Sequence, residues 1–244
     1  MSTVRSYRLL VIWQARRLKG VLPLAVVVQA LLALGIVIGY PLLFPQLDRG
    51  TTLLLATGAP TITLVTMGLV LVPQMVAQGK VEGSLDYMRS LPVPRLVYLL
   101  ADLTVWLAVV LPGVVFAVVV GDLRFGLHLA VSPLVVPAIL LVALTATAIG
   151  YAIASLLSAM LTNLLTQVLV VFVLMFSPLN FPAERLPDWL AAIHRVLPIA
   201  AMGEVIRGTL AGSVFPLSGG PFLLIGTWCV ASFAITYVVM NRRA

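Results

Sequence analysis

The sequence predicts an all-α integral membrane protein with six transmembrane helices, and three observations lead to this prediction. Hydrophobic residues make up 61% of the 244-residue chain and charged residues only 9%, too few to give a soluble domain a polar surface. The apolar residues are gathered in six long runs between short polar segments. Only helices satisfy their own backbone polar groups across lipid at these lengths. We therefore expect one transmembrane domain over residues 1–244.

Residues 1–20 are basic and precede the first apolar run. As a helix at ~100° per residue, they would place Arg5, Arg8, Arg16 and Lys19 about a quarter turn from an apolar side. That side would consist of Val4, Tyr7, Val11, Ala15 and Leu18. Two interpretations are open: an interfacial helix on the anionic cytoplasmic leaflet, or a basic tail that only orients the chain.

The six predicted spans are near or above the ~17–25 residues that cross a bilayer, with the fifth marginal. They are residues 21–44, 52–77, 96–120, 131–157, 163–179 and 221–240. The first is longer than the ~7–15-residue core of a signal peptide and lacks a cleavage site after it, so we expect it to be retained. Prolines in the first four spans can bend their helices.

The distribution of Lys and Arg predicts that both termini are cytoplasmic. With that orientation, the cytoplasmic basic residues are Arg5, Arg8, Arg16, Arg17, Lys19, Lys80, Arg89, Arg95, Arg242 and Arg243. The opposite side holds fewer: Arg49, Arg124, Arg185, Arg195 and Arg207. Because these charges sit at the ends of apolar runs and not in one patch, the net charge of +7 does not indicate nucleic-acid binding.

The polar segment 79–95, between the second and third spans, predicts a short surface helix. Its apolar face would consist of Val81, Leu85, Met88 and Leu91. Glu82 and Asp86, four residues apart, would share an adjoining face. Pro92 should end the helix, because proline has no backbone donor. A helix of about 10 residues is too short to span and should lie across the membrane surface; the alternative is a solvated loop helix.

Residues 180–212 predict two short helices. The first begins at Pro187 and Asp188 and ends at Pro198. Its apolar face would consist of Leu186, Trp189, Leu190, Ile193, Val196 and Leu197. The second carries Glu204 and Arg207, whose three-residue spacing should allow them to pair. Neither helix can span, so we expect a hairpin that dips into the outer leaflet; the alternative is a loop lying flat on the surface.

Several polar residues fall within or near the predicted spans. They are Gln29, Thr57, Thr61, Thr63, Thr66, Gln74, Asp102 and Gln167. Asp102 lies close to the cytoplasmic boundary, so we expect it to pair with a nearby cation and not to contact substrate. The threonines of the second span are more typical of helix packing than of a binding surface.

Two of these segments resemble a known family. In residues 79–95, an acidic residue is followed by Gly, Ser and Leu, and then by Leu-Pro-Val-x-Arg. This resembles the cytoplasmic coupling helix of the ABC-2 type permeases, the membrane subunits of one class of ATP-binding cassette exporters. The match is carried by Glu82, Gly83, Leu85, Leu91, Pro92 and Arg95. Residues 177–207 resemble the segment that these permeases fold between their fifth and sixth spans. Together the resemblances cover nearly the whole chain.

The resemblance implies a partner ATPase that binds ATP and Mg²⁺, with no cofactor in this chain. The residues expected to dock on it are Glu82, Gly83, Leu85, Asp86, Met88, Arg89, Leu91 and Pro92. The N-terminal helix would abut the same partner, and Glu204 and Arg207 would belong to a re-entrant gate. The resemblance also implies a second permease subunit, identical or different, in the lipid of a bacterial inner (plasma) membrane. The cargo would be a hydrophobic small molecule, lipid or glycan moved outward.

Other functional classes find less support in the sequence. The chain has no G-x-x-x-x-G-K-[ST] loop, so any ATP hydrolysis must come from another chain. An intramembrane hydrolase would have to use His128 or His194, both outside the predicted spans, and neither G-x-S-x-G nor H-E-x-x-H occurs. Cys229 is the only cysteine, which excludes an intramolecular disulfide and a cysteine metal cluster. We expect no catalytic or metal-binding residues in this chain. A non-ABC channel or an accessory assembly protein remains an alternative.

Overall fold

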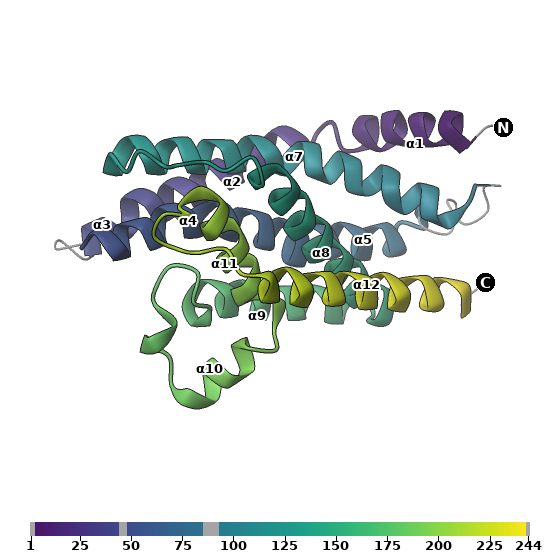
Figure 1. The fold of residues 1–244 in the computed structure, drawn as a ribbon. Helices are drawn as coiled ribbons and strands as arrows, with labels where there is room; N and C mark the ends of the chain where they lie inside the picture. The colour runs from purple at the N-terminus through teal and green to yellow at the C-terminus, as the bar shows by residue number, and fades with distance from the viewer. Residues whose placement is uncertain (1–2, 44–47, 85–92, 243–244) are drawn as a thin grey trace.

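A computed structural model describes residues 3–43, 48–84 and 93–242. Within these ranges every regular secondary-structure element is a helix, and no strand is present (Figure 1). The all-α prediction is confirmed. The first turn of α1 and the last turns of α5 and α12 lie at one end of the bundle, on the right in Figure 1. We call this the terminal end. The other end, which carries the segment 177–218, is called the hairpin end.

The long helices occupy the six predicted regions. They are α2 (Leu22–Leu34) with the π-helical turn η1 (Gly35–Gly39) and α3 (Tyr40–Leu43); α4 (Arg49–Thr66) with the π-helical turn η2 (Met67–Leu71) and α5 (Val72–Val81); α7 (Arg95–Phe125); α8 (Val135–Leu156); α9 (Ala159–Phe176); and α12 (Gly219–Arg242). Five stretches of the described residues are long and apolar enough to cross a membrane: Arg49–Val81, Val97–Phe125, Val135–Leu156, Ala159–Phe176 and Gly219–Val239. In the first predicted span, the apolar helix Pro23–Gly39 is shorter. The count of six spans therefore stays a prediction.

Several helix boundaries differ from the predicted spans, and the structure shows a local reason for two of them. The fourth helix begins at Val135 and not at residue 131, because Pro133 has no backbone donor and Ser132 instead donates its N–H to the carbonyl of Thr209 at 2.8 Å. The fifth begins at Ala159, four residues before the predicted start. There the Ser158 hydroxyl accepts from the backbone N–H of Leu161 at 3.4 Å and caps the helix.

The second span is interrupted by η2 directly before Pro73. Proline has no N–H to donate to the carbonyl four residues earlier, which here belongs to Leu69 in the π-helical turn. The turn also lies against α8: a Cβ placed on Gly150 would be 2.1 Å from the carbonyl oxygen of Gly68. Glycine is therefore required at this crossing, as in other close contacts between membrane helices.

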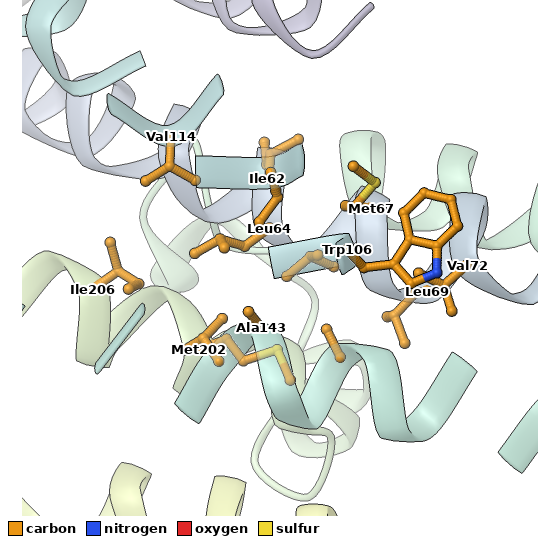
Figure 2. Packing of buried hydrophobic residues seen from close by; sticks show 14 of the residues in the cluster. Ile62, Leu64, Met67, Leu69, Val72, Trp106, Val114, Ala143, Met202 and Ile206 are labelled. Carbon is orange, nitrogen blue, oxygen red and sulfur yellow. The ribbon is translucent and has the colours of Figure 1, made fainter. Parts of the chain in front are cut away.

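The core is formed by α4, η2, α5, α7 and α8, together with a short helix from the hairpin end (Figure 2). Within this core, Ile62, Trp106 and Ala143 come from three different long helices. Met202 and Ile206 of α11 (Pro198–Leu210) pack into the same cluster. Helix α11 is thus part of the core and does not lie over its surface.

Asp48 caps the start of α4 outside the apolar spans. Its carboxylate accepts hydrogen bonds from the Thr51 hydroxyl at 2.5 Å and from the backbone N–H of Gly50 at 3.1 Å. These bonds, that of the Thr51 hydroxyl above all, stabilise the charged form and hold the pKa of Asp48 below its usual value.

Helix α1 (Thr3–Arg17) packs against the first half of α7. Leu10 is buried against Val97 and Ala101. The buried residues of this helix are Ser6, Leu10 and Gln14. The packed side is therefore rotated from the expected apolar side but overlaps it: Tyr7 and Val11 pack against the same cluster, whereas Val4 is 77% exposed. The packed side follows the shape of α7, which the periodicity of α1 alone does not contain.

At the hairpin end, the structure has a 3₁₀ turn, η3 (Ala183–Arg185), and two helices, α10 (Asp188–His194) and α11. The two helices meet at a bend of 73°. The apolar face predicted for the first helix is mostly uncovered: Leu190 is buried, whereas Trp189 and Val196 are exposed. The burial is instead concentrated in α11, which packs against α4, α8 and α12.

Candidate functional site

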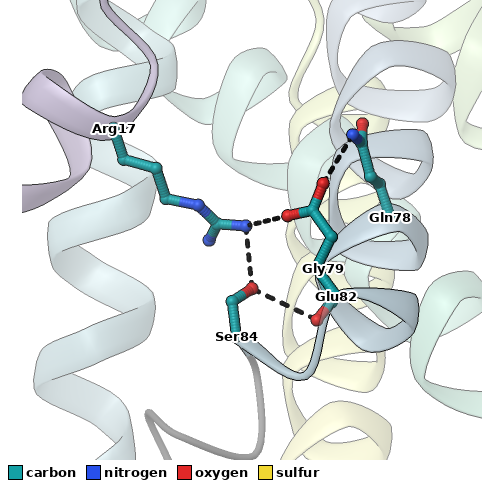
Figure 3. A network of polar contacts seen from close by, with 5 residues as sticks. All are labelled: Arg17, Gln78, Gly79, Glu82 and Ser84. Atoms are coloured by element: carbon teal, nitrogen blue, oxygen red, sulfur yellow. Dashed lines mark hydrogen bonds and ion pairs between the residues drawn. The ribbon is translucent and has the colours of Figure 1, made fainter.

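The terminal end holds a polar network that joins α1 to the end of α5 (Figure 3). Arg17 donates from Nη2 to Oε2 of Glu82 at 3.2 Å and to the hydroxyl of Ser84 at 2.7 Å. The other carboxylate oxygen of Glu82 accepts from the side-chain amide of Gln78 at 2.7 Å, and Ser84 donates to the carbonyl of Gly79 at 3.1 Å. Both oxygens of Glu82 are therefore held.

The backbone turn beneath this network explains the position of Glu82. Helix α5 ends at Val81, and the N–H of Glu82 still bonds to the carbonyl of Gln78 at 3.0 Å. Gly83 then adopts a left-handed conformation with φ of 71°, which a glycine tolerates without strain. Val81 still belongs to α5, so the predicted surface helix does not begin there; Ser84, after the turn, is helical, and the rest of that predicted helix lies outside the described residues.

Most of the residues predicted to dock on a partner lie outside the described part of the chain. These are Leu85, Asp86, Met88, Arg89, Leu91 and Pro92. Glu82 and Gly83 are described and lie at the point where the second span leads into that segment. Their predicted role stays a prediction, while their place at the terminal end is clear.

Lys80 connects the same turn to a second helix. Its ammonium group donates to the carbonyl oxygens of Ala154 and Leu157, the latter at 3.0 Å, at the end of α8. A cation at this position stabilises the unpaired carbonyls and the negative end of a helix. Six residues earlier on α5, Gln74 donates to the Thr166 hydroxyl of α9 at 2.9 Å. The end of the second span is thus bound to α1, α8 and α9.

Sequence reasoning assigned Lys80 and Arg17 only to membrane orientation and missed these contacts. Neither the carbonyl acceptors of α8 nor the approach of α1 is visible in a local pattern. The available signal was that Lys80 lies within segment 79–95 and Arg17 within residues 1–20, two segments that the family resemblance placed against the same partner.

Asp102 lies beneath this network in a small cavity with Gln14, Tyr98 and Tyr151. Its side chain is 4% exposed and accepts a hydrogen bond from the indole N–H of Trp106 at 3.2 Å. Among the described residues the ion pair within 4.0 Å is Arg17 with Glu82, and the partner that the structure shows for Asp102 is the indole one helical turn away on α7. The side chain of Arg95, at the start of the same helix, lies outside the described part of the chain, so the pairing of Asp102 with a cation stays a prediction.

The threonines of the second span serve packing, as the sequence indicated. Thr57, Thr61 and Thr63 are fully buried, and their hydroxyls donate to the carbonyls of Leu53, Thr57 and Ala59 in their own helix. These hydroxyls are satisfied within the helix and need no external ligand.

The hairpin end carries a cavity of about 410 Å³. Its lining includes Arg207 and Glu204 of α11, His194 of α10 and Phe215. Arg207 is 8% exposed and donates from Nη2 to the carbonyls of Leu179 at 3.1 Å and Pro178 at 3.5 Å. Its guanidinium lies 5.2 Å from the centre of the Phe215 ring.

The predicted ion pair between Glu204 and Arg207 is not formed. Glu204 is exposed, and in the described part of the chain no carboxylate lies within 4.0 Å of Arg207. The carbonyls after α9 draw the guanidinium into the protein, whereas the Glu204 side chain stays at the surface of an otherwise buried helix. Spacing of three residues permits such a pair but does not decide it.

His194 was considered only as a possible catalytic group, yet it is part of the hairpin packing. Its Nε2 lies 2.9 Å from the carbonyl of Phe176, and its ring stacks on Phe172 at 5.5 Å between centres. Among the described residues, no group of three His, Cys, Asp or Glu side chains is placed to hold a metal ion.

Comparison with known families identifies the family of most of the chain. Residues 5–211 match the family model described as ABC-2 type transporter. No curated protein matches the sequence. The matched range contains the network at the terminal end and both helices of the hairpin end.

Proposed function

This chain belongs to the ABC-2 type transporter family and is the permease component of an ABC transporter, and we propose that it is one of two permease subunits of an exporter powered by a separate ATPase. ATP and Mg²⁺ would bind to that ATPase. The cargo would be a hydrophobic small molecule, lipid or glycan, moved outward through a bacterial inner membrane. In the proposed orientation, the terminal end faces the cytoplasm, in agreement with the excess of Lys and Arg there.

The observation that carries this proposal is the attachment of the Lys80–Ser84 turn to three other elements. The turn leads directly into the segment proposed to dock on the ATPase. Arg17 connects it to α1, Lys80 to α8, and Gln74, six residues before Lys80, connects α5 to α9. A displacement of the docking segment would therefore move the ends of several helices together.

The π-helical turn η2 is the proposed hinge of this motion. It divides the 33-residue span Arg49–Val81 into the buried helix α4 and the shorter helix α5 that carries Lys80 and Glu82. Such turns interrupt the regular hydrogen-bond ladder and occur often at functional sites. Helix α5 would tilt relative to α4 when the ATPase closes, since nucleotide shifts the permease only by favouring contacts of one state over the other.

A second subunit is proposed to cover α9. Only 17% of this apolar helix is buried within the chain, and its residues Asn163 and Gln167 are exposed. These residues are four apart and share a face. A side-chain amide that faces lipid hydrocarbon lacks hydrogen-bond partners. Contact of this face with another protein helix would supply such partners and is therefore favoured over contact with lipid. An identical or a related permease chain would satisfy this surface.

The proposal is tested by reconstituting the purified chain in lipid vesicles with ABC ATPases encoded by the same genome. We expect one of them to co-purify with the chain and to hydrolyse ATP faster in its presence. We also expect ATP-dependent movement of an amphipathic dye or labelled lipid. A chain that conducts ions without ATP, or that binds no ATPase, would favour the alternative of a channel or an accessory assembly protein.

A further inference from the structure

We infer that the cavity at the hairpin end binds an oxyanion group, a carboxylate or phosphate ester, with Arg207 as its counter-charge. This inference concerns a ligand site and does not depend on ATP-driven transport. It rests on the placement of one buried charge, on the space beside it, and on a second buried polar group on the wall of the same cavity.

Arg207 carries a buried positive charge that is surrounded by neutral groups. The guanidinium is enclosed by α11, the segment after α9 and Phe215, and its side chain is 8% exposed. Its partners are neutral: the carbonyls of Pro178 and Leu179 and the face of the Phe215 ring. Nε is buried and has no partner among the described residues. A buried cation without an anion is unfavourable, so the site is incomplete as it stands.

Two cavities beside Arg207 offer space for a ligand. Arg207 lines the cavity of about 410 Å³ and also a neighbouring one of about 220 Å³. The larger volume lies in the range of small-ligand sites. Apolar and aromatic residues, among them Leu54, Phe181 and Phe215, form part of its wall. An oxyanion with an attached apolar body fits these surroundings better than a hydrated inorganic ion, because the wall offers both a charge and apolar area.

His194 is the second buried polar group on the wall of the larger cavity. Its Nε2 is 2.9 Å from the Phe176 carbonyl and must carry the proton there, since a carbonyl only accepts. The neutral ring then presents an acceptor at Nδ1, which is buried and has no partner among the described residues. The exposed carboxylate of Glu204 lines the same cavity. Both accept hydrogen bonds, so the favoured ligand carries a hydroxyl or ammonium group next to its oxyanion.

Two sources offer this chemistry: the headgroup of a membrane phospholipid and a soluble organic oxyanion, for which inorganic phosphate is the minimal probe. The protein is compared in detergent and in nanodiscs at constant ionic strength. In detergent, inorganic phosphate is titrated against chloride, and unfolding is followed by tryptophan fluorescence. In nanodiscs, phosphatidylcholine alone is compared with phosphatidylcholine containing phosphatidylglycerol, and native mass spectrometry counts retained lipid.

The variants separate the site from general charge effects. Arg207→Gln removes the buried charge, and Arg124→Gln removes an exposed arginine of α7 that lines neither cavity. Ala191→Trp reduces the cavity while leaving Arg207 in place, and it decides the question if Arg207→Gln does not fold. We expect oxyanion binding to weaken at least tenfold in Arg207→Gln and Ala191→Trp and to stay within twofold of the parent in Arg124→Gln.

Stabilisation by phosphate in detergent would support a soluble oxyanion, and retention of phosphatidylglycerol alone would support a lipid headgroup. Equal binding by the parent, Arg207→Gln and Ala191→Trp would overturn the inference, as would a parent protein that neither phosphate nor anionic lipid stabilises. None of these measurements involves an ATPase. Failure here would therefore leave the proposed function untouched, and failure of ATPase binding would leave the oxyanion site untouched.

Discussion

Arg17 at the end of α1 and Glu82 at the end of α5 are 65 positions apart in the chain and form an ion pair of 3.2 Å. Their side chains are 28% and 48% exposed. A pair with this much exposure contributes only ~0–1 kcal/mol to stability. Its importance is geometric, because it holds α1 beside the turn that enters the proposed docking segment.

Replacing Glu82 by Lys is therefore expected to impair coupling more than folding. The new ammonium would face Arg17 and repel it, so the turn should move while the spans stay inserted. We expect unchanged membrane yield and a several-fold loss of ATPase recovery or of ATP-dependent transport. Glu184→Lys, an exposed acid at the hairpin end, is the matched control. Normal recovery and transport in Glu82→Lys would remove these contacts from the coupling pathway.

The crossing of η2 and α8 predicts a large effect from a single methyl group. In Gly150→Ala, the new Cβ would meet the Gly68 carbonyl at 2.1 Å, so one backbone must shift. Overpacking of this kind destabilises by roughly 1–3 kcal/mol, which thermal unfolding in detergent would detect. Gly226→Ala in α12, where a Cβ meets nothing within 4 Å, is the control and should be neutral or slightly stabilising. Similar melting of the two variants would contradict the close approach.

The uncovered amides of α9 predict association through this helix. Gln167→Leu removes the hydrogen-bonding group without loss of apolar area. Interhelical hydrogen bonds in membranes contribute about 0.6–1.7 kcal/mol, so dimerisation in lipid should weaken roughly three- to twentyfold. Subunit counting by single-molecule photobleaching over a dilution series would measure it. Val168→Leu, at an exposed apolar position, should dimerise like the parent. No difference between the two variants would argue against an interface on α9.

Arg207 and Glu204 are expected to respond unequally to neutralisation. Arg207→Gln leaves the carbonyls of Pro178 and Leu179 without their donor inside the protein, which costs about 1–3 kcal/mol. Glu204→Gln changes an exposed side chain and should behave like the parent in membrane yield and melting temperature. The double variant should resemble Arg207→Gln alone. If removal of Glu204 were as harmful as removal of Arg207, the two charges would be coupled after all.

Membrane orientation is testable with single cysteines in a Cys229→Ala background. Ser90→Cys, in the segment after the terminal-end turn, should be protected from impermeant thiol reagents in intact cells. Ser213→Cys, exposed at the hairpin end, should react. Labelling of Ser90→Cys alone would reverse the proposed orientation.

The sequence by itself determined the class of protein and the place of its helices. Long apolar runs leave the backbone no alternative to helices in lipid. The family pattern around Glu82, Gly83 and Arg95 led to the ABC-2 family, which the match over residues 5–211 confirmed. The sequence also predicted two short helices within residues 188–210, because the prolines at 187 and 198 mark where each helix begins.

Only the tertiary structure decided which polar groups meet. Spacing along one helix suggested that Glu204 pairs with Arg207, but the guanidinium donates to the carbonyl of Leu179, because α11 is inserted in the core beside the end of α9. Arg17 pairs with Glu82, and Asp102 accepts a hydrogen bond from the indole of Trp106. A periodic pattern states which side chains share a face of one helix. It does not contain the position of the neighbouring helix, and the partner of a buried charge depends on that position.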